Sequence, residues 1–169
     1  MEAYEIKLHE VMWGCLLVAI TMAIHGTGMF VILRFADSLK ERFAPMESFV
    51  GGLGLVILAS LMIVAVNIIE VMVWTVFFFL TGAQTNHNVA FYNALLNFTT
   101  LQAGYLPLRW HLLEPLLAMA GLLTVAWSTG ILYMLAQDFQ DTQLRKRERG
   151  KQGKATGNRD RHPPAETAG

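Results

Sequence analysis

Three long apolar runs decide what this chain can fold into. They cover residues 11–35, 50–80 and 112–135, and each exceeds the roughly 20 residues that a helix needs to cross the hydrocarbon core of a bilayer. Hydrophobic residues make up 54% of the sequence and charged residues only 15%, against about a quarter in soluble domains. A soluble fold has too little polar surface to cover so much apolar area. The sequence therefore predicts an all-α membrane protein with three transmembrane helices.

A fourth apolar stretch, NVAFYNALLNFTTLQAGYLP, lies between the second and third runs. It is too short to cross a membrane as a helix, and it ends in a polar segment that contains a glycine. Such backbone is tolerated at membrane depth only where protein or water covers it. We predict a re-entrant pore helix over residues 88–100 and a filter-like loop over residues 101–107, with Asn88 as the N-cap or Asn86 as the alternative.

The positive charges indicate an orientation. We divide the chain into a lead-in (residues 1–10), a transmembrane domain (11–140) and a basic tail (141–169), which we expect to be disordered beyond about Gly150. Eight of the thirteen Lys and Arg residues follow Leu144. The positive-inside rule then places the tail in the cytoplasm and the N-terminus outside a bacterial inner membrane. Contact with anionic membrane lipids is the expected role of the tail, rather than nucleic-acid binding.

Two short motifs carry a resemblance to a known family. They are Phe-Thr-Thr-Leu-Gln-Ala-Gly-Tyr at residues 98–105 and Ala-Trp-Ser-Thr at residues 126–129. They resemble the Thr-Thr-Leu-Gly-Tyr-Gly-Asp and Gly-Trp-Ser-Thr motifs of small bacterial ion channels of the two-pore-domain potassium channel-like family. His25 in the first run and Glu70 in the second run also resemble features of that family. The resemblance implies a homotetramer that conducts monovalent cations, with no enzymatic activity and no other cofactor.

The filter departs from the family pattern where selectivity is decided. A potassium filter replaces the ion's water by rings of backbone carbonyls, and aiming them requires left-handed backbone angles that glycine adopts freely. Without gaps, Gln102 and Ala103 stand where the family has Gly and Tyr. We therefore predict a weakly selective or non-potassium-selective cation channel, or alternatively a non-conducting scaffold or accessory subunit. The predicted filter and pore residues are Thr99, Thr100, Leu101, Gln102, Ala103, Gly104 and Tyr105.

Polar residues inside the apolar runs are the other candidates for function. Asn67 and Glu70 share one helical face with Trp74 in the second run, and His25 lies in the first run. Because a carboxylate in mid-span needs a partner, we expect Glu70 to pair with His25. The pair would act as a proton-sensitive latch, since histidine titrates near neutral pH, or would simply fix the helix register.

The third run carries a stripe of small and polar residues. Gly121, Thr124 and Ser128 fall on one helical face with Glu114, and such a face suits a pore lining or helix packing. Gly121 would serve as a hinge or as a packing glycine, and Glu114 would lie near the outer interface or behind the filter. The region also contains Trp110, which we expect in the aromatic belt. No HxxxH or CxxC spacing supports a metal site or a haem-binding redox anchor.

Overall fold

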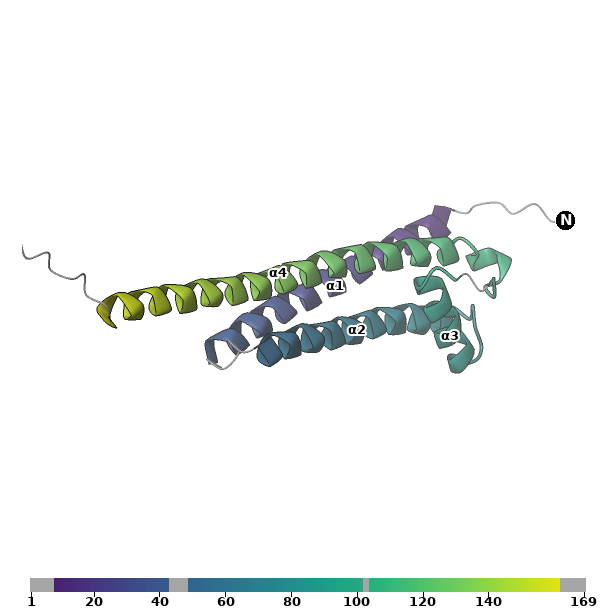
Figure 1. Ribbon diagram of the computed structural model, residues 1–169. Helices are drawn as coiled ribbons and strands as arrows, with labels where there is room; N and C mark the ends of the chain where they lie inside the picture. The colour runs from purple at the N-terminus through teal and green to yellow at the C-terminus, as the bar shows by residue number, and fades with distance from the viewer. Residues whose placement is uncertain (1–7, 43–48, 102–103, 162–169) are drawn as a thin grey trace, which may run out of the picture.

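The computed structural model describes residues 8–42, 49–101 and 104–161, and all the regular structure in those ranges is helical. Three helices are long and apolar enough to cross a membrane: α1 (Leu8–Arg42), α2 (Phe49–Leu80) and α4 (Leu113–Arg161). They correspond to the three predicted spans, which confirms the all-α class and the three long apolar helices (Figure 1).

The three long helices lie side by side, and glycines bring them close together (Figure 1). A Cβ atom added to Gly28 of α1 would lie 2.7 Å from Cγ2 of Val66 in α2. A Cβ atom on Gly14 of α1 would lie 2.2 Å from Cδ1 of Leu116 in α4. Small residues at contact points are the usual means of packing helices in lipid, where no hydrophobic force drives them together.

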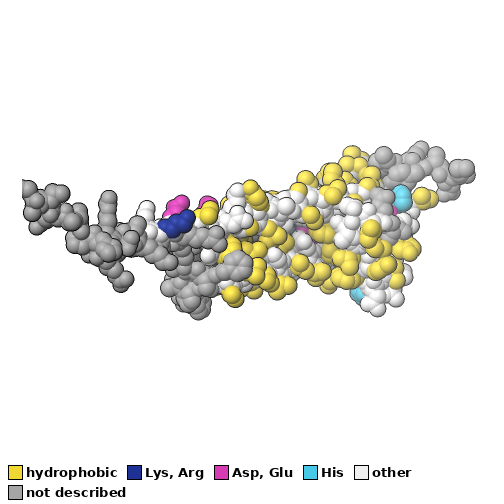
Figure 2. Space-filling view, in the orientation of Figure 1, with side chains coloured by type: hydrophobic (Ala, Val, Ile, Leu, Met, Phe, Trp, Pro, Cys, Tyr) yellow, Lys and Arg dark blue, Asp and Glu magenta, His cyan; other side chains and the backbone are white. Residues whose placement is uncertain are grey.

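Apolar side chains cover much of the outside of this bundle (Figure 2). Large hydrophobic residues such as Leu61 on α2 and Leu122 on α4 are more than half exposed. Extensive exposed apolar surface is unusual on a soluble monomer and typical of a face that meets membrane or partner. The surface is thus consistent with membrane localisation.

A short helix and a loop close one end of the bundle. Helix α3 (His87–Phe98) follows α2, and a 3-10 turn, η2 (Leu108–Trp110), precedes α4. Figure 1 shows α3 at the end where α2 finishes and α4 starts, whereas α1 finishes and α2 starts at the opposite end. Asn86 is the N-cap, since its side chain accepts a hydrogen bond from the Asn88 amide at 2.9 Å. The preferred assignment of Asn88 as the cap was therefore wrong, and the helix is shorter than predicted.

Helix α4 runs far beyond the predicted third span. It continues to Arg161, past Gly150, where we expected disorder. The segment after the span is rich in Gln, Lys, Arg and Glu, which have high helix propensity, and its first proline is Pro163. The prediction of disorder was wrong because it relied on the absence of an apolar stripe. Helix propensity alone favours continuation of a helix that has already formed. Residues 162–169 of the predicted tail and 1–7 of the lead-in lie outside the described residues.

Candidate functional site

One imidazole connects all three long helices. Nδ1 of His25 in α1 lies 2.8 Å from Oε1 of Glu70 in α2, and Nε2 lies 3.2 Å from Oγ of Ser128 in α4. The side chains of His25 and Glu70 are both 0% exposed. The expected pairing of His25 with Glu70 is present. The third member, Ser128, was not predicted as its partner. We call these three residues the polar junction.

A second polar contact ties α1 to α2 one turn away from the junction. Nε1 of Trp74 donates to Oγ1 of Thr21 at 2.9 Å, and the Thr21 hydroxyl donates to the Leu17 carbonyl at 2.9 Å. The Trp74 and Thr21 side chains are fully buried. Two buried polar contacts between the same helices fix their register, because sliding either helix would leave polar groups unpaired in an apolar environment.

The junction holds more acceptors than donors. In the described part of the chain, Oε2 of Glu70 is buried and has no hydrogen-bond partner. Oδ1 of Asn67, one turn earlier on α2, is likewise buried and without a partner among the described residues. A buried acceptor without a donor costs about 1–3 kcal/mol, and more if it is charged.

The C-terminal end of α3 packs closely against a glycine of α4. A Cβ atom on Gly121 would lie 2.0 Å from the carbonyl oxygen of Phe98, the last residue of α3. Gly121 therefore makes the close approach of the two backbones possible, which identifies a packing role for it. Eight residues separate Gly121 from Leu113, where α4 begins, a rise of about 12 Å along the helix. The C-terminal end of α3 thus packs against α4 about two helical turns after the first residue of α4.

The buried face of α3 contains a polar pair that the sequence analysis missed. Nδ2 of Asn97 donates to Oδ1 of Asn93 at 2.9 Å, and both side chains are fully buried. Ala90 and Ala94 flank them on the same face. The spacing of Asn93 and Asn97, four residues apart among alanines, is the signal that would have indicated a shared helical face.

The loop after α3 presents its predicted filter residues to the surface. Thr99, Thr100, Leu101, Gly104 and Tyr105 are all exposed in the single chain. Thr100 and Gly104 have left-handed backbone angles, with φ of 65° and 64°. Gln102 and Ala103, on which the predicted selectivity depends, lie outside the described residues.

Glu114 anchors the far end of this loop. Its Oε1 accepts a hydrogen bond from the Leu106 amide at 3.0 Å, and its Oε2 lies 3.9 Å from Nδ1 of His111. The loop is tied on its other side by Gln84, whose Nε2 donates to the Tyr105 carbonyl at 2.8 Å. Although Glu114 is close to the start of α4, it is only 3% exposed. The loop is therefore held by α4 on one side and by the connection between α2 and α3 on the other.

The predicted stripe on α4 faces inward. Thr124 is fully buried, Ser128 contacts His25, and Gly121 contacts α3. The shared face is present, and within one chain it is used for packing; a pore-lining role for it stays a prediction. Trp110, expected in an aromatic belt, is instead buried, with its ring 5.6 Å from that of Phe77.

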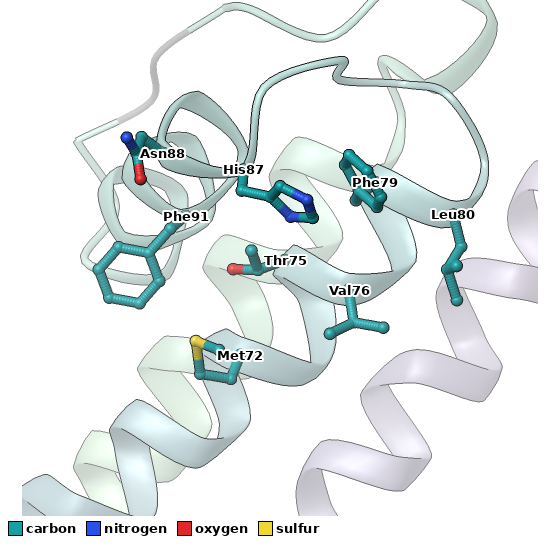
Figure 3. Close-up of a pocket in the computed structure, with 8 residues that line it drawn as sticks. All are labelled: Met72, Thr75, Val76, Phe79, Leu80, His87, Asn88 and Phe91. Atoms are coloured by element: carbon teal, nitrogen blue, oxygen red, sulfur yellow. The ribbon is translucent and has the colours of Figure 1, made fainter.

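An outward-facing groove of about 550 Å³ lies between α2 and the first turns of α3 (Figure 3). His87 stacks on Phe79 there, with ring centroids 3.6 Å apart. The groove is mostly apolar, and its lining residues are Met72, Thr75, Val76, Phe79, Leu80, His87, Asn88 and Phe91. It is separate from the polar junction, which is enclosed by the three long helices.

No group of three or more His, Cys, Asp and Glu side chains in the described ranges is arranged to hold a metal ion. Comparisons with protein-family models, with curated proteins and with solved structures found no match to this chain. Functional inference therefore depends on the chain's own geometry.

Proposed function

We propose that this protein is a channel-like membrane protein, in which copies of α3 and its loop surround a cation pathway with weak or no preference for potassium. The main observation behind this proposal is the close packing of the Phe98 carbonyl against Gly121. It supports a re-entrant α3, because a helix of 12 residues is only about 18 Å long and its end lies beside the third turn of α4 rather than beyond the start of α4.

The electrostatics at the end of α3 favour a cation. The carboxyl end of a helix carries roughly half a negative charge, and the hydroxyls of Thr99 and Thr100 lie at that end. In the single chain, Leu101 is 69% exposed and Tyr105 is 58% exposed. These two large side chains beside the threonines suit burial against further copies, and closed cyclic symmetry would bring the α3 ends of four copies around one axis.

The loop sequence supports a pathway that does not select for potassium. Rings of backbone carbonyls need left-handed backbone angles that glycine adopts freely, and Gln102 and Ala103 stand where the potassium filters that this loop resembles have Gly and Tyr. Non-glycine residues adopt that conformation at a cost of roughly 1–2 kcal/mol each. In the proposed orientation the N-terminus and α3 face the outside of a bacterial inner membrane, and the basic end of α4 faces the cytoplasm.

Radiotracer uptake into liposomes tests this function. Purified protein should admit rubidium and sodium at similar rates. Gly121→Ala should abolish both fluxes, because its Cβ atom would collide with the Phe98 carbonyl. Gly130→Ala is the matched control: Gly130 is also in α4, and a Cβ atom there would meet nothing within 4 Å. A strong preference for rubidium would contradict the proposed lack of selectivity.

One observation favours a second candidate, a non-conducting scaffold or accessory subunit. Thr124 and Ser128, the polar residues of the α4 stripe, are buried inside one chain, whereas exposed α4 residues such as Leu122 and Val125 are apolar. A pore lined by that exposed face would be poorly hydrated. An assembled wild-type oligomer that admits neither ion would support the scaffold and contradict the channel.

A further inference from the structure

We propose that the polar junction is a binding site for one proton per chain, and that this proton is retained in the middle of the folded bundle. The site consists of Glu70 and His25, with Ser128 as the partner of the second imidazole nitrogen. The inference does not depend on whether the protein conducts ions, because it follows from the charges and contacts of the junction alone.

The net charge of the site favours a bound proton. An ionised Glu70 beside a neutral His25 would leave one negative charge among apolar helices. The apolar segments around Glu70 contain no Lys, Arg, Asp or further Glu that could compensate this charge. These segments are residues 11–33, 50–69, 71–80, 88–108 and 115–137. The side chains that α4 presents to His25 are Ser128 and Trp127, neither of which carries a charge. One added proton brings the pair to net zero, which removes the uncompensated charge that a low-dielectric interior disfavours.

The unpartnered carboxylate oxygen also favours a bound proton. Oε2 of Glu70 is buried without a donor in the described structure. A carboxylate oxygen without a donor is costlier to bury than the carbonyl oxygen of a neutral carboxyl group. This oxygen therefore favours the form in which Glu70 itself carries the proton.

The observed contacts accommodate the extra proton without rearrangement. If Glu70 carries it, the carboxyl O–H donates to Nδ1 of His25 and the Nε2–H donates to Oγ of Ser128. If His25 carries it, Nδ1–H donates to the carboxylate and Nε2–H again donates to Ser128. Both forms are neutral overall and use the same 2.8 Å and 3.2 Å contacts. Loss of the proton would place a net charge at the point where α1, α2 and α4 meet.

The proposal predicts how folding depends on pH. In an unfolded chain the ordinary pKa values of Glu and His are about 4.3 and 6.5, so above pH 7 the unfolded pair binds essentially no proton. The folded pair would bind one. Stability falls with rising pH wherever the folded state binds more protons than the unfolded state. This junction should therefore make the folding equilibrium constant fall as the pH rises above 7, by at most about tenfold per pH unit.

The test is reversible unfolding in detergent micelles across that pH range, with two glutamine variants. Glu70→Gln supplies a neutral amide in place of the protonated carboxyl and should remove this pH dependence. Glu114→Gln is the matched control: Glu114 is also a buried carboxylate, near the start of α4, but it accepts a backbone amide, so this variant should keep the wild-type dependence.

Either of two results would overturn the proposal: a wild-type equilibrium that does not change between pH 7 and pH 9, or the same pH dependence in wild type and Glu70→Gln. If Glu70→Gln does not fold, the double variant His25→Phe with Glu70→Leu replaces both members by apolar side chains, which buried ion pairs often tolerate. The double variant should also lack this pH dependence, and retention of that dependence would refute the site.

Discussion

Glu70 and Glu114 are two buried carboxylates whose partners differ in kind. Glu70 lies at the junction of three long helices and pairs with the side chain of His25, leaving one oxygen without a partner in the described structure. Glu114 lies near the start of α4, accepts the backbone amide of Leu106, and has the half-exposed His111 nearby. The first carboxylate connects helix to helix, and the second connects a loop to a helix.

The contrast shows how depth determines what a carboxylate can do in this fold. Near the end of the bundle, a backbone donor and a partly exposed imidazole stabilise Glu114 without help from other spans. In the middle, no backbone donor is free, because helical amides are already bonded within their own helices. Glu70 can be satisfied only by side chains from other helices, so its burial makes it a connector of the bundle. The two sites should therefore respond differently to the same substitution.

The largest expected effect is that of Glu70→Ala. This change leaves Nδ1 of His25 buried without a partner and opens a cavity where α1 meets α2. Removal of one member of a buried pair typically costs about 3–5 kcal/mol, so we expect a loss of that order in the free energy of unfolding, measured by denaturation in detergent. A loss below about 1 kcal/mol would show that the junction does not hold the helices together.

Gly121→Ala should give the next largest effect, and it tests the close packing of α3 against α4. The new methyl group would meet the Phe98 carbonyl oxygen at 2.0 Å, and relief requires movement of α3 or α4. Overpacking of this kind costs about 1–3 kcal/mol. Gly130→Ala, with open space around the new methyl, should instead gain up to about 1 kcal/mol from helix propensity. Equal effects of the two substitutions on the free energy of unfolding would contradict the close approach at Gly121.

Glu114→Ala should give a smaller and more local effect. It leaves the buried Leu106 amide without its acceptor, a loss of about 1–3 kcal/mol that we expect near the lower end because part of the loop is exposed. Hydrogen exchange should accelerate at residues 104–106 and remain unchanged around His25. Faster exchange at the junction as well would show that loop and junction unfold together, and the contrast between the two carboxylates would not hold.

Much of this arrangement could be predicted from the sequence because apolar context restricts partners. The three long helices follow from run length and hydropathy, and the His25–Glu70 contact follows from the scarcity of polar groups in those runs. A carboxylate among apolar residues must meet a complementary group. His25 is the only histidine in the first apolar run, so little choice remained.

The rest depends on how the helices are rotated, which local pattern does not encode. Ser128 reaches His25 only because α4 turns its small face toward α1, and contacts such as that of Gly26 with Trp127 set that rotation. Trp110 is buried within the chain because Phe77 of α2 lies beside it. These outcomes follow from tertiary packing, which overrides the preferences of single residues.

The smallest expected effect, that of Ser128→Ala, separates the junction's core pair from its third member. The serine hydroxyl contacts Nε2 of His25 at 3.2 Å, and hydrogen bonds between membrane helices contribute about 0.6 kcal/mol on average. We expect a loss of that size in the free energy of unfolding. Thr129→Ala is the matched control, because the neighbouring Thr129 is exposed and its hydroxyl bonds only to the Val125 carbonyl of its own helix in the described structure. If Ser128→Ala cost as much as Glu70→Ala, the junction would act as an indivisible triad. If Ser128→Ala cost no more than Thr129→Ala, the junction would be reduced to the His25–Glu70 pair.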